Sequence, residues 1–123
     1  MKKTDISLNG IKITEAGIAD SYFLRLRGLI GRSAKELGGL LIVPCNQIHT
    51  CFMSEAIDVL YLDRSGRVLK VDKNVPKGRF CKAVKHARSV LELPAGTACE
   101  WFIRPGDKIG VNNKLVYDNS VYV

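Results

Sequence analysis

The residues with the greatest chemical potential lie near the middle of the chain. Cys45, His49 and Cys51 fall within seven residues, and thiolate sulfur and imidazole nitrogen are ligands that zinc prefers. If residues 48–53 form a strand, His49, Cys51 and Met53 share one face. Their spacing is not a standard zinc signature, however, and cysteines and strand histidines are commonly buried structural residues. We therefore expect no metal or other cofactor and keep Cys45, His49 and Cys51 as the alternative ligand set.

The same segment offers a candidate Cys–His nucleophile. A nucleophilic thiol needs its base within about 2.6–3.2 Å and usually a third residue that orients the base. His49, Cys51 and Asp58 are the candidates for these roles. Same-face neighbours on a strand do not approach so closely without a bulge, and no glycine-rich oxyanion loop lies nearby. The sequence favours a protein without enzymatic activity. The alternative is a small hydrolase or metal-dependent enzyme that uses His49 with Cys51 or Cys45.

Two charged residues, Arg27 and Glu92, stand among apolar neighbours. A charge that is buried in such a setting needs a partner. The two side chains are expected either to pair with each other or to line a binding pocket together with His49. The candidate binding set also includes Thr50 and Met53 from the segment that contains His49.

Positive charge is concentrated in one segment. The whole chain has a net charge of +7, and residues 70–88 alone carry +6, because Asp72 is their only acid. The candidate binding residues of this segment are Lys70, Lys73, Lys77, Arg79, Lys82, Lys85 and Arg88. Phe80 is the only aromatic residue among them, and no nucleic-acid-binding motif appears, so nucleic acid is not the favoured partner. We expect a binding or accessory module that presents this basic surface to an acidic protein or an anionic surface.

Length and composition favour one domain, residues 1–123, with one hydrophobic core, since 46% of the residues are hydrophobic. The longest apolar run, about 40–44, is far shorter than the ~20 residues that cross a bilayer. No signal-peptide pattern follows the basic start. We therefore expect a cytoplasmic protein with reduced thiols, and the oligomeric state stays open.

The predicted elements are mostly strands. Asn9-Gly10 favours a type I′ turn and predicts a hairpin over residues 5–15. Apolar spacing of three to four residues predicts a helix at about 20–30, capped by Asp20. Further predictions are a helical turn at 33–37, strands at 40–43, 48–53, 57–62, 67–71, 87–93, 108–111 and 115–117, a loop at 73–82, and a helix that starts with a Thr97–Glu100 capping box. The fold class is α+β, a mainly antiparallel, closed or nearly closed small barrel with two short helices.

Several motifs in order resemble one known family. They are Leu26-Arg27-Gly28-Leu29, Ile48-His49-Thr50 with Met53, Ile57 to Asp63, Val90 to Thr97, and Arg104-Pro105-Gly106-Asp107. Together they are similar to the family catalogued as domain of unknown function 192, over about residues 20–110. The resemblance implies a small prokaryotic protein of mixed α/β structure with a sheet-rich core, from a family without an agreed activity and with members that are often exported.

Overall fold

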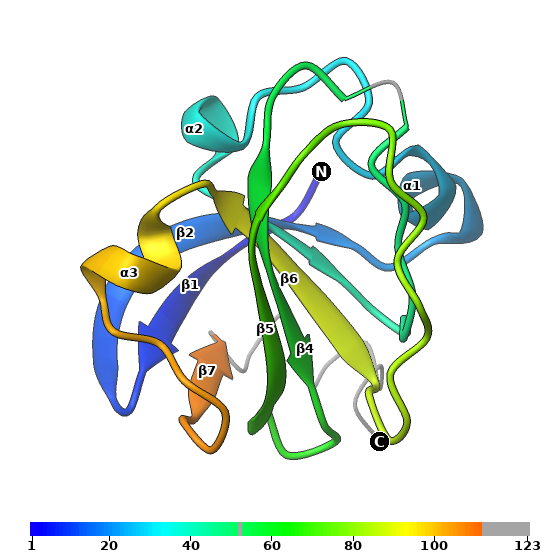
Figure 1. Cartoon of the computed structure of the whole chain (residues 1–123). Coiled ribbons are helices and arrows are strands. Elements are labelled where there is room, and N and C mark those ends of the chain that lie inside the picture. Colours follow the sequence, from blue (N-terminus) through cyan, green and yellow to red (C-terminus); the bar gives the residue numbers. More distant parts are fainter. Residues whose placement is uncertain (52, 112–123) are drawn as a thin grey trace.

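The fold is one curved sheet with short helices at its margins (Figure 1). The computed structural model describes residues 1–51 and 53–111, so the predicted strand at 115–117 lies outside the described residues. Within them, the elements are β1 (Lys3–Leu8), β2 (Ile11–Ala19), α1 (Tyr22–Arg27), α2 (Ala34–Leu37), β3 (Leu40–Ile42), β4 (Ile57–Leu62), β5 (Val68–Val75), β6 (Ser89–Pro94), α3 (Thr97–Glu100) and β7 (Ile109–Val111).

Both predicted hairpins are confirmed. Asn9 and Gly10 join β1 to β2 with φ angles of 50° and 90°, the positive values that a type I′ turn requires. Between β4 and β5, the Asp63 carboxylate accepts hydrogen bonds from the backbone N–H groups of Ser65 and Arg67, each at 2.9 Å. These short-range bonds explain why the local sequence was sufficient to predict both turns.

The predicted α+β class and the mainly antiparallel pairing are confirmed, and the described residues form three short helices rather than two. The sheet is open, however, so the prediction of a closed or nearly closed barrel is wrong. Its order is β5-β4-β6-β3-β2-β1-β7, and it curls into a half-barrel. β2 and β3 pair in parallel, with Gly17 opposite Leu40, because residues 20–39 cross over between them. The two edges of the sheet approach at one corner, where the Val68 N–H of β5 donates to the carbonyl of Asp107, two residues before β7, at 2.8 Å.

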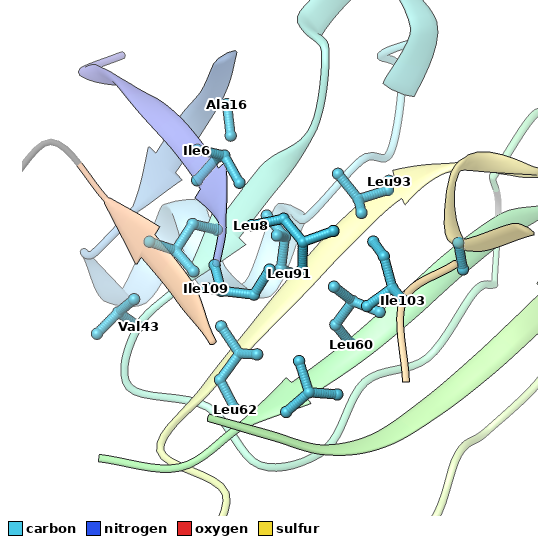
Figure 2. Close-up of a cluster of buried hydrophobic side chains, with 13 residues drawn as sticks. Ile6, Leu8, Ala16, Val43, Leu60, Leu62, Leu91, Leu93, Ile103 and Ile109 are labelled. Carbon is cyan, nitrogen blue, oxygen red and sulfur yellow. The ribbon is translucent and has the colours of Figure 1, made fainter. Parts of the chain in front are cut away.

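Apolar side chains pack on both faces of the sheet, so the expected single core is replaced by two clusters. All six residues of β4 are buried, and alternation along a strand sends them to opposite faces. The inner cluster, inside the curve of the sheet, includes Ile6, Leu8, Leu60, Leu62, Leu91 and Ile109 (Figure 2). The outer cluster includes Leu29, Leu40, Ile42, Ile48, Met53 and Tyr61.

The helices are shorter than predicted, and two of their caps differ. Ser21 rather than Asp20 caps α1, since its Oγ accepts from the Leu24 N–H at 3.2 Å. The predicted turn at 33–37 is confirmed as α2. The capping box of α3 does not form, because the Thr97 hydroxyl donates to the Pro94 carbonyl at 2.7 Å. None of the helices in the described residues is long and apolar enough to cross a membrane.

The predicted strand at 48–53 is wrong. In its place, His49 forms an isolated β-bridge with Phe80, and the chain then turns, with the Met53 N–H donating to the Thr50 carbonyl at 3.3 Å. The turn breaks the alternation that would have put His49, Cys51 and Met53 on one face. The described residues of the connecting segments 44–56 and 76–88 pack on the outer cluster, to which they contribute Ile48, Met53 and Ala87.

Candidate functional site

One pocket lies between α1 and the outer face of the sheet. Its volume is about 310 Å³, and it is lined by residues of α1 and its C-terminal extension, by Ile42, by the 44–53 loop and by Glu92 of β6. It brings together Arg27, His49, Met53 and Glu92 of the predicted binding set. We call it the α1 pocket.

Glu92 forms part of the floor of the α1 pocket. It lies in β6 opposite Leu40 of β3 and Val59 of β4, and only 1% of it is exposed. Its Oε1 atom has no hydrogen-bond partner among the described residues. Burial raises the pKa of Glu92 to about 8, because a charge is poorly solvated there. At pH 7 most of this carboxyl group is therefore protonated and neutral.

His49 contributes a second unpartnered atom. Its Nδ1 is buried without a hydrogen-bond partner in the described part of the chain. The ring lies 5.9 Å from the ring of Phe80, measured between centroids. The β-bridge and this ring contact hold the imidazole at the pocket, between the two loops.

The last turn of α1 supplies two cations. The Nη1 of Arg25 donates to the Asp20 carbonyl at 3.2 Å, and the Nε of Arg27 donates to the Ile30 carbonyl at 3.1 Å. Both arginines line the α1 pocket. The expected ion pair between Arg27 and Glu92 is not among the ion pairs of the described residues, since Arg27 is exposed and bonds to its own loop while Glu92 is buried.

Cys45 and Cys51 are separated by the turn in the 44–53 loop. Cys45 lines the pocket and its thiol donates to the Gln47 carbonyl at 3.1 Å, whereas Cys51 is not among the lining residues. Burial is the main cause that raises the pKa of the Cys45 thiol. Within residues 1–51 and 53–111, no three His, Cys, Asp or Glu side chains are grouped closely enough to hold a metal ion. The alternative ligand set of Cys45, His49 and Cys51 is therefore not brought together.

Asp58 faces the other side of the sheet from the α1 pocket. Its carboxylate accepts hydrogen bonds from the backbone N–H groups of Asn74 (2.9 Å), Gly96 (3.1 Å) and Ala98 (2.8 Å). Asp58 pairs with Leu93 across β4 and β6, and Glu92 pairs with Val59. Asp58 therefore does not orient His49, as the nucleophile hypothesis required, but ties β4 to β5 and α3.

Thr50 is a structural residue rather than part of the pocket wall. It is fully buried. Its hydroxyl group donates to the Pro76 carbonyl at 2.6 Å and accepts from the Arg79 N–H at 2.9 Å. These bonds fasten the His49 loop to the 76–82 segment.

The basic residues are divided among several places. Lys70, Lys73, Arg79 and Lys82 line a shallow groove of about 390 Å³ along β5, here called the basic groove. Lys70 is paired with Asp72 at 3.5 Å. Arg88 lines a different hollow beside Cys45 and Asn46, and Lys77 and Lys85 are exposed outside both.

Sequence reasoning missed much of the α1 pocket wall. Arg25, Gln47 and Ile42 all line it, and their residue types are too ordinary to identify them. One signal was available in Gly28. Its φ is +54°, a positive value that favours glycine, and the residue lies beside Glu92, since a Cβ atom at this position would make an ordinary contact with Glu92 Oε1 at 4.0 Å.

Comparison with known proteins supports the resemblance seen in the motifs. The family model DUF192, described as an uncharacterized ACR, matches residues 4–111. The chain belongs to the DUF192 family. In this DUF192 protein, the matched residues include all the described elements from β2 to β7 and every residue that lines the α1 pocket.

Two archaeal relatives agree with this assignment. The UPF0127 protein of Thermococcus sibiricus is 32% identical over 97 residues, which are 75% of this chain and 62% of the relative. The UPF0127 protein of Pyrococcus horikoshii is 34% identical over 102 residues, which are 77% of this chain and 85% of the relative. The DUF192 chain thus spans less than two thirds of the Thermococcus protein.

Two crystal structures share the fold. A protein from Sinorhizobium meliloti, named as a candidate transcription regulator, superposes with a TM-score of 0.78 at 21% identity and covers 89% of this chain and 94% of its own. A protein of unknown function from Novosphingobium aromaticivorans gives a TM-score of 0.72 at 20% identity and covers 88% and 83%. At these identities the likeness establishes the fold alone.

Proposed function

We propose that this DUF192 protein is a non-enzymatic binding module whose α1 pocket takes a small-molecule ligand. The observation that carries the proposal is that Glu92 Oε1 and His49 Nδ1, two buried polar atoms without partners among the described residues, both belong to residues that line this pocket. Buried polar groups in proteins are nearly always hydrogen-bonded. Both atoms are buried in this structure, so a ligand that bonds to them must shift the lining of the pocket slightly.

The size and lining of the pocket support the same proposal. Ligand pockets are typically about 300–1,000 Å³, mostly apolar, with a few polar groups that orient the ligand. The α1 pocket, at about 310 Å³, falls at the small end of this range, and Leu29, Ile42, Ile48 and Met53 line it beside the polar groups.

The chemistry of Cys45 favours binding over a Cys–His nucleophile. A nucleophilic cysteine works as its thiolate, and a lowered pKa marks it. Cys45 shares the pocket with His49, but burial raises the pKa of its thiol, and the thiol hydrogen bond goes to the Gln47 carbonyl. The enzyme hypothesis therefore has less support than the binding hypothesis.

Removing the imidazole acceptor tests the proposed binding function. A mixed library of anionic, neutral and cationic fragments is titrated into ¹⁵N-labelled protein, and the binders are expected to shift amide signals of the α1 pocket. His49→Phe keeps a ring beside Phe80 but removes Nδ1, so affinity should fall about tenfold, the cost of one good hydrogen bond.

The second histidine provides the matched control. His86 is exposed and outside the α1 pocket, and its φ of 71° is tolerated by asparagine. His86→Asn should bind the same fragments with unchanged affinity. Shifts that avoid the pocket residues, or equal losses in His49→Phe and His86→Asn, would contradict the proposal.

The basic groove supports a second candidate function, the binding of an acidic protein segment. Lys73, Arg79 and Lys82 line the groove and have no ion-pair partner within residues 1–51 and 53–111. Phe80 lies among them and is 80% exposed. Cations around one exposed aromatic ring suit an acidic peptide that also carries apolar side chains.

Neutralising the groove tests this second candidate. The triple variant Lys73→Gln, Arg79→Gln, Lys82→Gln should bind polyglutamate about tenfold more weakly at low salt, and raising the salt should remove most of the difference by screening. The control variant removes the same charge elsewhere: Lys35→Gln, Arg64→Gln, Arg104→Gln. Equal losses in both variants, or tighter binding of a random-sequence DNA duplex than of polyglutamate, would contradict an acidic protein partner.

A further inference from the structure

The rim of the α1 pocket is cationic. Arg25 and Arg27 occupy the last turn of α1, and each donates one hydrogen bond to a backbone carbonyl. A guanidinium group has five N–H donors, so most donors of both side chains stay available to a ligand. Among the described residues, neither arginine has an ion-pair partner.

Positive charge accumulates beside this rim. The pKa of Arg32 is lowered by its burial and, second, by the charge of Arg27, so a third guanidinium group lies near Arg27, although Arg32 does not itself line the pocket. A carboxylate at the rim would meet the positive potential of Arg25 and Arg27, and the fork of N–H groups on an arginine matches the two oxygens of a carboxylate.

The floor of the pocket does not oppose an anion at neutral pH. Glu92 is the only acid that lines the pocket in the described part of the chain, and burial raises its pKa to about 8. Its protonated form carries no charge and offers one O–H donor. The other titratable groups that line the pocket are Arg25, Arg27, Cys45, His49 and Tyr22.

The walls between rim and floor are mainly apolar. The apolar lining residues come from α1 and its C-terminal extension, from β3 and from the 44–53 loop, and they are Leu26, Leu29, Ile42, Ile48 and Met53. Burying the body of a ligand against them gains about 25 cal/mol per Å² of apolar surface. The pocket thus combines cations at its opening, apolar walls, and a neutral polar floor.

We propose that the α1 pocket selects a small amphipathic organic anion, with one carboxylate at the Arg25–Arg27 rim, an apolar body against the walls, and a hydroxyl group against Glu92 and His49. This inference rests on the binding function proposed above and names the ligand class of the same pocket. A cationic ligand would face the two arginines, and a polyhydroxylated neutral ligand would leave most of its hydroxyl groups against apolar walls.

Three matched probes test the ligand class. The first is 4-(hydroxymethyl)benzoate, the second its neutral amide 4-(hydroxymethyl)benzamide, and the third 4-methylbenzoate, which keeps the carboxylate and lacks the hydroxyl group. Calorimetry at low salt measures affinity, and ¹⁵N shifts of pocket residues verify where each probe binds. The hydroxymethyl benzoate should bind about tenfold more tightly than either of the other two.

Arginine variants identify the source of the preference. The double variant Arg25→Gln, Arg27→Gln should bind the benzoate and the benzamide with equal affinity, whereas Lys35→Gln, Arg64→Gln, which removes two exposed charges outside the pocket, should keep the wild-type preference. Raising the pH from 7 to 9 should weaken benzoate binding to the wild type, because Glu92 then becomes ionised and repels the carboxylate. Glu92→Gln should bind equally at both values.

The outcomes separate this inference from the binding function itself. If the benzamide binds in the α1 pocket as well as the benzoate does, or better, the anion preference is overturned and the binding function stands. If the preference survives in Arg25→Gln, Arg27→Gln, the assigned rim is wrong. If no probe and no fragment of the mixed library shifts the pocket residues, both proposals are overturned.

Discussion

Replacing Glu92 with glutamine is expected to stabilise the protein at pH 7 by about 3 kcal/mol. The carboxyl group has a pKa of about 8 in the folded protein against an ordinary value of 4.5. At pH 7 the unfolded chain carries an ionised Glu92 and the folded protein a neutral one, so folding must take up a proton. Each pH unit between the two pKa values costs about 1.4 kcal/mol. Glutamine has nearly the same shape and does not titrate.

The sign of this effect fixes its pH dependence. Because the folded pKa is raised, the contribution of Glu92 to stability is fully present below about pH 4.5 and is lost as the pH rises through about 8. Wild type and Glu92→Gln should therefore have similar free energies of unfolding at pH 4 and differ most at pH 9. Urea unfolding at several pH values measures this difference.

An exposed glutamate provides the control for Glu92. Glu100 lies on the surface in α3, and Glu100→Gln should leave both the stability and its pH dependence within about 0.5 kcal/mol of the wild type. A constant difference between Glu92→Gln and the wild type from pH 4 to 9 would contradict a neutral Glu92 in the folded protein.

Replacing Asp58 with alanine is expected to destabilise the protein by about 4 kcal/mol, the largest loss that we predict. Its buried carboxylate holds the backbone N–H groups of Asn74, Gly96 and Ala98 at 2.8–3.1 Å, and hydrogen bonds to a charged group contribute about 1.5–3 kcal/mol each. Alanine would leave these donors unsatisfied. Asp58→Asn keeps one acceptor oxygen, so its free energy of unfolding should fall by about half as much. This variant can be measured if the alanine variant does not fold.

The matched control is another carboxylate with a similar number of bonds. Asp63 accepts from the Ser65 N–H and hydroxyl and from the Arg67 N–H, at 2.8–2.9 Å, but it lies in a surface turn where water can replace it. Asp63→Ala should cost about 1 kcal/mol. Equal losses of melting temperature in Asp58→Ala and Asp63→Ala would show that the burial of Asp58 adds nothing to its bonds.

Turn chemistry made much of the local structure predictable. Asn9-Gly10 and the Asp63 turn determine their own backbone conformation through residues next to them, and both hairpins form as predicted. The caps were less predictable. The N-terminal amides of α3 are held not by Thr97 but by Asp58, which is about 40 residues away in the chain, and no local pattern encodes such a contact.

The candidate site was predictable in its members but not in its geometry. Arg27 and Glu92 were predicted as site residues because charges among apolar residues are unusual. Both line the α1 pocket with His49. Their lack of a mutual ion pair depends on where α1 sits over β6. The strand predicted around Cys51 was wrong because the Met53 N–H bonds back to the Thr50 carbonyl, which is incompatible with an extended backbone.

By itself, the sequence determined the hairpins, most strand positions, the family and the residues that are unusual for their surroundings, since these depend on neighbours in the chain. The tertiary structure decided that β2 and β3 pair in parallel, that the sheet stays open, and that both of its faces are covered. It also decided that the Oε1 atom of Glu92 is buried without a hydrogen-bond partner among the described residues. The physical reason is that desolvation and hydrogen-bond satisfaction depend on every segment that packs around a group, and those segments come from distant parts of the chain.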